Sequence, residues 1–235
     1  MYHNRPTVAD MRAMKARGQK ISMLYVTNFE EAAAAAAAGI NMLSIEGRFM
    51  SPEMREAAGD CFIQVGLPYG PFGDLVSAED YLRAAFHFMR MGGDCFYCAA
   101  SLDIQKVLCD NAVPIVAHVG LIPSQNTWTG GFKAVGKTAQ SAKAVWDHVK
   151  RLEAIGAFGA ELEVVPDRVA EFITKNTSML MLGMGAGLTQ MGSIYLLKMF
   201  WAITGGINRA TPRLTAILGL STTGCSRSAF PLSKS

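Results

Sequence analysis

Short apolar runs that alternate with amphipathic or alanine-rich segments constrain the fold of this chain more than any other feature. The runs are residues 21–26, 41–46, 61–65, 94–98, 113–118, 160–164 and 179–183. Most are nearly continuous in apolar character, which is typical of strands covered on both faces by helices. The segments between them predict helices at 29–38, 78–92, 102–110, 138–155, 167–175 and 188–201.

Repeated strand–helix units indicate a parallel sheet. We therefore predict an α/β fold in which the sheet closes into a (β/α)8 TIM barrel, a fold that begins at roughly 200 residues. An open doubly wound sheet is the alternative, although no GxGxxG follows the first apolar run. We expect one barrel domain over residues 1–220 and a polar, serine-rich tail over 221–235.

Composition excludes several classes of protein. Half of the residues are hydrophobic and 17% are charged, which excludes intrinsic disorder. The net charge of +3 is small and scattered, so we expect no nucleic-acid partner. The apolar stretch 179–204 is long enough to cross a bilayer, but its glycines favour a buried strand, a loop and a core helix. We therefore expect no membrane association.

Two further features concern the compartment. Residues 1–20 are polar and lack the apolar region of a secretory signal. The five cysteines are an odd number without regular spacing, which favours free thiols in a reducing compartment. We therefore expect a cytoplasmic protein.

Polar side chains stand where several predicted strands end. Glu46 and Arg48, His118 and Glu163 each close a different strand or follow it directly. Because catalytic groups of a parallel barrel lie at the carboxyl ends of its strands, these residues are expected at one mouth. A carboxylate, an imidazole and a guanidinium suit proton transfer beside an anionic substrate. The structural alternatives are a histidine that bonds a backbone carbonyl, a glutamate in an ion pair, and solvated surface charges.

Several motifs carry a resemblance to a known family. The most specific is VPIVAHVGLIPSQNTWTGGFKAVGK at residues 113–137. It is accompanied, in collinear order, by LPYG (67–70), ELEVVP (161–166), MLGMGAG (181–187) and AITGG (202–206). Together these segments resemble the ketopantoate hydroxymethyltransferase family, also called 3-methyl-2-oxobutanoate hydroxymethyltransferase.

This resemblance implies a barrel of the phosphoenolpyruvate-mutase and isocitrate-lyase superfamily, assembled as a homo-oligomer. It implies transfer of a one-carbon unit from 5,10-methylenetetrahydrofolate to the α-carbon of 3-methyl-2-oxobutanoate, a small 2-oxo acid. The product enters pantothenate biosynthesis. In the family, Mg²⁺ chelates the acid and stabilises its enolate as a Lewis acid.

The resemblance also assigns roles to residues of this chain. Glu163 occupies the position of the general base, and His118 that of a histidine that holds the substrate. Glu46 stands in place of a magnesium-binding aspartate and is expected to be a weak metal ligand. The second metal-binding aspartate is replaced by Gly66.

The substrate-binding part of the site has also changed. Cys98 is aligned with a lysine that contacts the substrate, so a positive charge is lost there. Gly47 and Arg48, which follow Glu46, are assigned to the substrate, and the guanidinium of Arg48 can replace the lost charge.

These losses leave three functions open. The first is the reaction of the family, and the second is carbon–carbon bond formation or cleavage on another 2-oxo acid or related carbonyl compound. The third is a non-catalytic barrel that serves as a binding or assembly subunit. Binding of Mg²⁺ and of a 2-oxo acid discriminates between an enzyme and a non-catalytic subunit.

Overall fold

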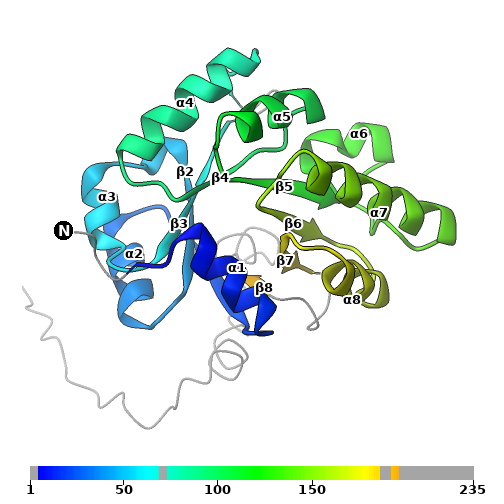
Figure 1. Ribbon diagram of the computed structural model, residues 1–235, viewed down its shortest axis with the longest axis horizontal. Coiled ribbons are helices and arrows are strands. Elements are labelled where there is room, and N and C mark those ends of the chain that lie inside the picture. Colours follow the sequence, from blue (N-terminus) through cyan, green and yellow to red (C-terminus); the bar gives the residue numbers. More distant parts are fainter. Residues whose placement is uncertain (1–4, 69–72, 186–191, 196–235) are drawn as a thin grey trace, which may run out of the picture. The chain divides into compact units, whose positions relative to one another are not determined.

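The computed structural model describes residues 5–68, 73–185 and 192–195. Its strands are parallel and follow one another around a curled sheet (Figure 1). They are β1 (Ile21–Tyr25), β2 (Met42–Glu46), β3 (Phe62–Gly66), β4 (Cys95–Tyr97), β5 (Ile115–Gly120), β6 (Gly159–Glu163), β7 (Leu180–Met184) and β8 (Gly192–Tyr195). The seven predicted strands are thereby confirmed, each within two residues of its predicted bounds.

Helices cover the outside of this sheet (Figure 1). The predicted ones are α2 (Phe29–Ala37), α4 (Ala78–Arg90), α5 (Leu102–Asp110), α7 (Ala139–Ala154) and α8 (Asp167–Asn176). The shorter α1 (Val8–Ala16), α3 (Pro52–Ala57) and α6 (Asn126–Thr129), and the 3-10 turns η1 (Gly47–Phe49) and η3 (Pro123–Gln125), were not predicted. These short helices lack a long amphipathic pattern.

The prediction of a helix over 188–201 is wrong at Gly192–Tyr195, where β8 pairs with β7 and with β1. Strand pairing there outweighs the helical spacing of apolar residues. The rest of that predicted helix and the boundary between residues 220 and 221 lie outside the described residues. The described chain is thus a parallel α/β fold with a TIM-barrel-like sheet.

The helices begin where their sequences supply capping side chains. At the start of α4, the Ser77 hydroxyl accepts from the Asp80 backbone N–H, and the Asp80 carboxylate accepts from the Ser77 N–H. This reciprocal pair satisfies two amide donors that the first helical turn leaves without partners. Asn28 caps α2 and Ser101 caps α5 through their side-chain oxygens.

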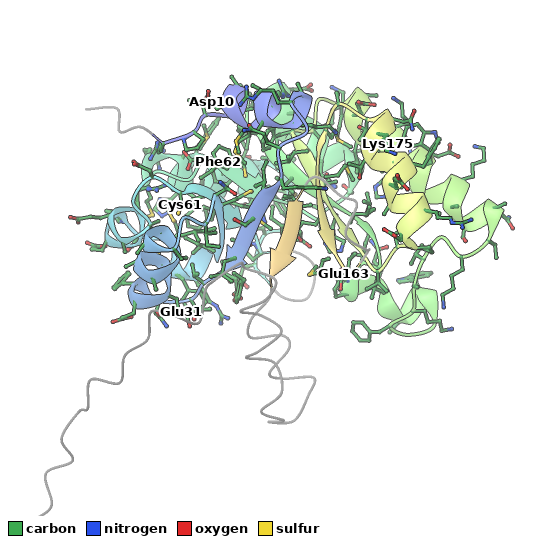
Figure 2. The ribbon with its side chains drawn as sticks, turned by 90° about the horizontal axis from the view of Figure 1, so that it is seen from below. Asp10, Glu31, Cys61, Phe62, Glu163 and Lys175 are labelled. Atoms are coloured by element: carbon green, nitrogen blue, oxygen red, sulfur yellow. The ribbon has the colours of Figure 1, made fainter. Side chains whose placement is uncertain are left out.

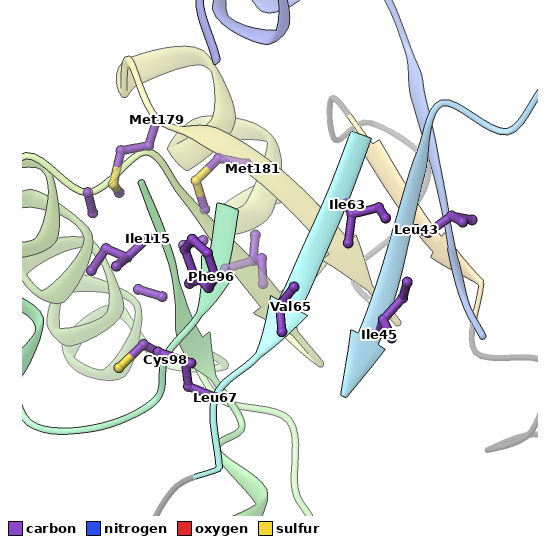
Figure 3. Packing of buried hydrophobic residues seen from close by; sticks show 14 of the residues in the cluster. Leu43, Ile45, Ile63, Val65, Leu67, Phe96, Cys98, Ile115, Met179 and Met181 are labelled. Atoms are coloured by element: carbon purple, nitrogen blue, oxygen red, sulfur yellow. The ribbon is translucent and has the colours of Figure 1, made fainter. Parts of the chain in front are cut away.

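Side chains alternate between two layers along β1 to β7. The outer layer faces the helices and is apolar, as Leu43, Ile63, Phe96 and Met181 illustrate (Figure 3). The inner face holds a separate apolar cluster near the amino ends of the strands, consisting of Met11, Ile21, Met23, Met42, Phe62, Cys95, Val116, Phe158, Leu180 and Leu182. Polar side chains follow on this inner face toward the carboxyl ends.

Helix α1 closes the amino-terminal end of the sheet. Its Met11 is fully buried in the inner cluster, and the Lys15 ammonium donates to the carbonyl oxygens of Thr177 at 2.6 Å and of Met179. Burial lowers the pKa of Lys15 to about 8. Figure 2 shows Asp10 of α1 and Glu163 at opposite ends of the sheet, so the end that carries Glu163 is not the end that α1 covers.

The described residues bear on two expectations from the sequence, which concern membrane-spanning helices and free thiols. Among the described helices, none combines the length and the hydrophobicity that a bilayer crossing requires. The cysteines at positions 61, 95, 98 and 109 carry free thiols.

Gly159 provides a test of how tightly β6 and β7 pack. A Cβ at this position would lie 2.6 Å from the Leu180 carbonyl oxygen, so Gly159→Ala must separate the two strands. We expect a loss of about 1–3 kcal/mol in the free energy of unfolding, measured by urea denaturation. Gly66→Ala is the matched control, because a Cβ at Gly66 comes no closer than 3.6 Å to its neighbours. Equal losses in both variants would contradict this account.

Candidate active site

A cavity of about 770 Å³ opens at the carboxyl ends of the strands. Residues of β1, β2, β3, β4 and β6 contribute to its wall, together with the segments that follow β2 and β3. The lining residues are Tyr25, Ser44, Glu46, Gly47, Arg48, Gly66, Leu67, Pro68, Gly73, Asp74, Leu75, Tyr97 and Glu161. Of the four polar residues predicted at one mouth, Glu46 and Arg48 line this cavity, whereas His118 and Glu163 do not.

His118 and Glu163 form a buried pair between β5 and β6. The His118 Nε2 lies 3.0 Å from Glu163 Oε2 and 2.7 Å from the carbonyl oxygen of Leu121. The N–H is aligned with the carbonyl and not with the carboxylate, so Glu163 Oε2 has no hydrogen-bond donor in the described residues. Because a carbonyl only accepts, Nε2 carries a proton in either charge state of the ring.

The other face of the imidazole contacts the cavity wall. The Tyr97 hydroxyl lies 2.7 Å from His118 Nδ1, and Glu161 Oε2 lies 3.7 Å from the same nitrogen. Tyr97 and Glu161 line the cavity, whereas His118 and Glu163 are almost completely buried behind them. Tyr97 and Glu161 therefore connect the His118–Glu163 pair to the cavity.

The charges of these groups depend on one another. Burial alone would lower the pKa of His118, but the contact with Glu163 and the charges of both glutamates outweigh it and leave the pKa above its usual value. Burial raises the pKa of Glu161, and the His118 ring and a 2.7 Å hydrogen bond from Gln64 Nε2 offset only part of this effect. The site thus favours a cationic imidazole beside buried carboxyl groups.

A close approach of β5 to β6 allows His118 and Glu163 to meet. Gly120 has a φ of +89°, and a Cβ there would lie 2.3 Å from the Glu163 carbonyl oxygen. The same oxygen accepts from the Leu121 N–H at 2.9 Å. Val164, directly after Glu163, has a φ of +46°, which is strained for a β-branched residue. The Val164 N–H donates to the Met184 carbonyl at 2.9 Å, so pairing with β7 stabilises this strained backbone conformation at the end of β6.

Glu46 and Arg48 lie on the opposite wall, where the sequence placed them. The Glu46 carboxylate accepts from the Tyr25 hydroxyl and pairs with Arg48 Nε at 2.7 Å. The Arg48 guanidinium also lies over the Phe49 ring, 4.6 Å from its centroid. Gly66 is the register partner of Glu46 on the neighbouring strand. Both predicted metal positions, together with Gly47, therefore border the cavity.

Cys98 does not reach the cavity, which corrects its assignment to the substrate. Its side chain is fully buried in the outer apolar layer beside Leu67 (Figure 3). Side chains alternate along a strand, so the inward position of β4 is Tyr97, one residue earlier. The assignment was displaced by one residue, which exchanges the two faces of the sheet.

Tyr25, Gln64 and Tyr97 are polar members of the site that sequence reasoning missed. Each lies two or four residues after an inward apolar side chain of the same strand, as Gln64 follows Phe62. Alternation along the predicted strands was the signal that could have found them. The same alternation correctly placed Glu161 on the face of Glu163.

The described side chains do not form a complete site for Mg²⁺. Across the described ranges, no cluster of three or more His, Cys, Asp or Glu side chains is arranged to hold a metal ion. Gly66 offers no oxygen beside Glu46, whose carboxylate already contacts Tyr25 and Arg48. The donor set at this wall therefore does not fit the ion that the family resemblance implies.

Comparison with known proteins agrees with the motifs. Residues 49–214 match the family model described as ketopantoate hydroxymethyltransferase. A 3-methyl-2-oxobutanoate hydroxymethyltransferase of Francisella tularensis subsp. holarctica is 34% identical over 154 residues, which cover 64% of this chain and 57% of that relative. The matched part thus spans somewhat more than half the length of that relative.

Solved structures agree on the fold. 2,3-Dimethylmalate lyase, a member of the PEP mutase/isocitrate lyase superfamily, is similar with a TM-score of 0.58 and 12% identity, covering 94% of this chain and 92% of its own. Phosphonopyruvate hydrolase, solved in complex with oxalate and Mg²⁺, has a TM-score of 0.57 and 13% identity over 90% of this chain and 88% of its own.

The contact between His118 and Glu163 leads to a prediction for the pKa of His118. We expect its pKa, measured from the ring-proton shifts in NMR spectra, to lie above 6.5 and to fall in Glu163→Gln, because the imidazolium then loses an adjacent negative charge. His118→Asn assigns the resonance among the four histidines. A pKa that is unchanged in Glu163→Gln would contradict the coupling.

Proposed function

The chain belongs to the ketopantoate hydroxymethyltransferase family, and on this premise we propose that it transfers a hydroxymethyl group to 3-methyl-2-oxobutanoate. The donor is 5,10-methylenetetrahydrofolate, the product enters pantothenate biosynthesis, and the scaffold is a complete (β/α)8 barrel. The observation that carries this proposal is the contact between His118 and Glu163 near the carboxyl ends of adjacent strands, beside a cavity of about 770 Å³.

Glu163 is the base in this proposal. Carbon 3 of the acid lies next to the oxo group, so removal of its proton gives an enolate whose charge is shared with the oxo oxygen. The Glu163 Oε2 atom is buried behind Tyr97 and Glu161 without an aligned donor, so it can accept that proton from an acid that reaches past these two side chains. His118 Nε2 lies 3.0 Å from this oxygen, and the contact with Glu163 raises the pKa of His118, so a cationic imidazole stands beside the base.

His118 and Tyr97 act on the developing negative charge. With Nε2–H donated to Leu121, a cationic ring donates its Nδ1–H to the Tyr97 oxygen. The Tyr97 hydroxyl, which borders the cavity, then donates to the enolate oxygen of the bound acid. Carbon 3 of the enolate forms the new bond to the one-carbon unit. The two carbon–nitrogen bonds that held this unit break, water supplies the hydroxyl oxygen and protons for both nitrogens, and tetrahydrofolate leaves. The proton taken from carbon 3 completes the hydroxyl group of the product.

The homo-oligomer implied by the family is part of the proposal. Trp128 and Phe132 are exposed to 90% and 69%, and such apolar side chains are suited to an interface between subunits.

Enolisation is the step that tests the proposal most directly. We expect the protein to exchange the proton at carbon 3 of 3-methyl-2-oxobutanoate for deuterium in D₂O, followed by NMR. Glu163→Gln should slow this exchange at least about a hundredfold, because an amide cannot accept the proton.

The matched control is Glu79→Gln, which removes an exposed carboxylate on α4 and should leave the exchange rate unchanged. Loss of exchange in both variants, or in neither, would contradict the role of Glu163. No exchange by the wild-type protein would favour another acid or a non-catalytic barrel.

The inward position of β4 gives an independent prediction. Tyr97→Phe should lower the exchange rate at least about tenfold, because the enolate loses a donor. Cys98→Ala should leave exchange unchanged and lower the free energy of unfolding by about 1 kcal/mol, since the thiol fills space in the outer layer. Slower exchange in Cys98→Ala with unchanged exchange in Tyr97→Phe would contradict this assignment and support a role for Cys98 in substrate binding.

A further inference from the structure

We infer that this cavity binds its acid without a divalent cation and that the Arg48 guanidinium supplies the positive charge for the carboxylate. The inference rests on the proposed function for the identity of the acid. Its evidence is the arrangement of Glu46, Arg48, Tyr25 and Gly66 at one wall.

The oxygens that a metal ion would need are missing or already engaged. Magnesium prefers octahedral oxygen coordination and usually binds one or two carboxylates. Glu46 contributes one carboxylate, but its register partner Gly66 contributes none. One Glu46 oxygen accepts from the Tyr25 hydroxyl and the other pairs with Arg48.

The position of Arg48 adds a second obstacle to a metal. Its Nε lies 2.7 Å from Glu46, so a divalent ion bound to that carboxylate would lie close to a guanidinium. A divalent cation and a guanidinium at such short distance repel each other. Metal binding at Glu46 therefore requires Arg48 to leave.

The same contacts prepare Arg48 as a carboxylate receptor. Glu46 holds the Nε, and the Phe49 ring lies against the face of the guanidinium. The guanidinium also interacts with the Tyr25 hydroxyl, and its terminal amino groups have the geometry that binds two carboxylate oxygens. The side chain is 70% exposed, so a ligand can reach it. Among the described residues that line the cavity, Arg48 is the one with a permanent positive charge.

Gly66 offers a reverse test, because the wall has room for the missing carboxylate. A Cβ at Gly66 would lie 3.6 Å from the Glu46 Cα and 3.7 Å from the Ile45 carbonyl oxygen, which are ordinary contacts. Gly66→Asp combined with Arg48→Gln places two carboxylates on neighbouring strands and removes the competing cation. This double variant should gain a metal site that the wild-type chain lacks.

Mn²⁺, a paramagnetic substitute for Mg²⁺, reports metal binding independently of activity. In electron paramagnetic resonance titrations, we expect the free Mn²⁺ signal to be unaffected by the wild-type protein and to decrease with the double variant. Depletion of free Mn²⁺ by the wild-type protein that Glu46→Gln abolishes would overturn the inference.

Calorimetry tests the acid. We expect 3-methyl-2-oxobutanoate to bind the wild-type protein with the same Kd, within about twofold, in EDTA and in MgCl₂. Arg48→Gln should raise the Kd at least about tenfold, equivalent to about 1.4 kcal/mol. The matched control is Arg83→Gln, which removes an exposed guanidinium from α4 and should leave the Kd unchanged.

The outcomes separate this inference from the proposed function. Acid binding that requires Mg²⁺ overturns the inference and leaves the proposed reaction standing. Acid binding in EDTA without deuterium exchange supports the inference and contradicts the reaction. No acid binding in either medium overturns recognition by Arg48 together with the proposed substrate.

Discussion

The alternation of side chains along parallel strands in fixed register is the constraint on which the rest of this structure depends. Outward positions are apolar and bind the helices to the sheet. Inward positions are apolar near the amino ends and polar near the carboxyl ends, as Met42, Ser44 and Glu46 illustrate along β2. Because every strand runs in the same direction, this change from apolar to polar residues places a packed apolar cluster at one end of the sheet and a polar cavity at the other.

Within that cavity, the junction of β5 and β6 holds the chemistry in place. Gly120 permits the close approach of the two strands, and the Leu121 carbonyl fixes which nitrogen of His118 carries a proton. The backbone thus determines both the position of the imidazole and its hydrogen bonding. In the sequence analysis, a bond from His118 to a backbone carbonyl was the alternative to a functional role. In the structure this bond, to Leu121, belongs to the arrangement that orients His118 toward Tyr97.

The opposite wall, which contains Glu46, Arg48 and Gly66, carries other charges than the family resemblance implies. A glutamate paired with an arginine stands where the resemblance implies two carboxylates around a cation. Such a pair holds the guanidinium in one orientation, which lowers the conformational entropy lost when a carboxylate binds. The family resemblance thus implies changed residues at this wall, whereas His118 and Glu163 occupy the positions that it assigns to the histidine and the base.

By itself, the sequence determined the strand–helix order, the bounds of seven strands, and the location of Glu46, His118 and Glu163 at strand ends. Apolar runs and family motifs are local along the chain, so they can be recognised without a structure. The tertiary structure alone decided that Tyr97 and not Cys98 faces inward, that Gly192–Tyr195 is a strand, and that Glu46 is engaged by Tyr25 and Arg48. These features depend on which strands pair and in which register, and a shift of one residue along a strand exchanges its two faces.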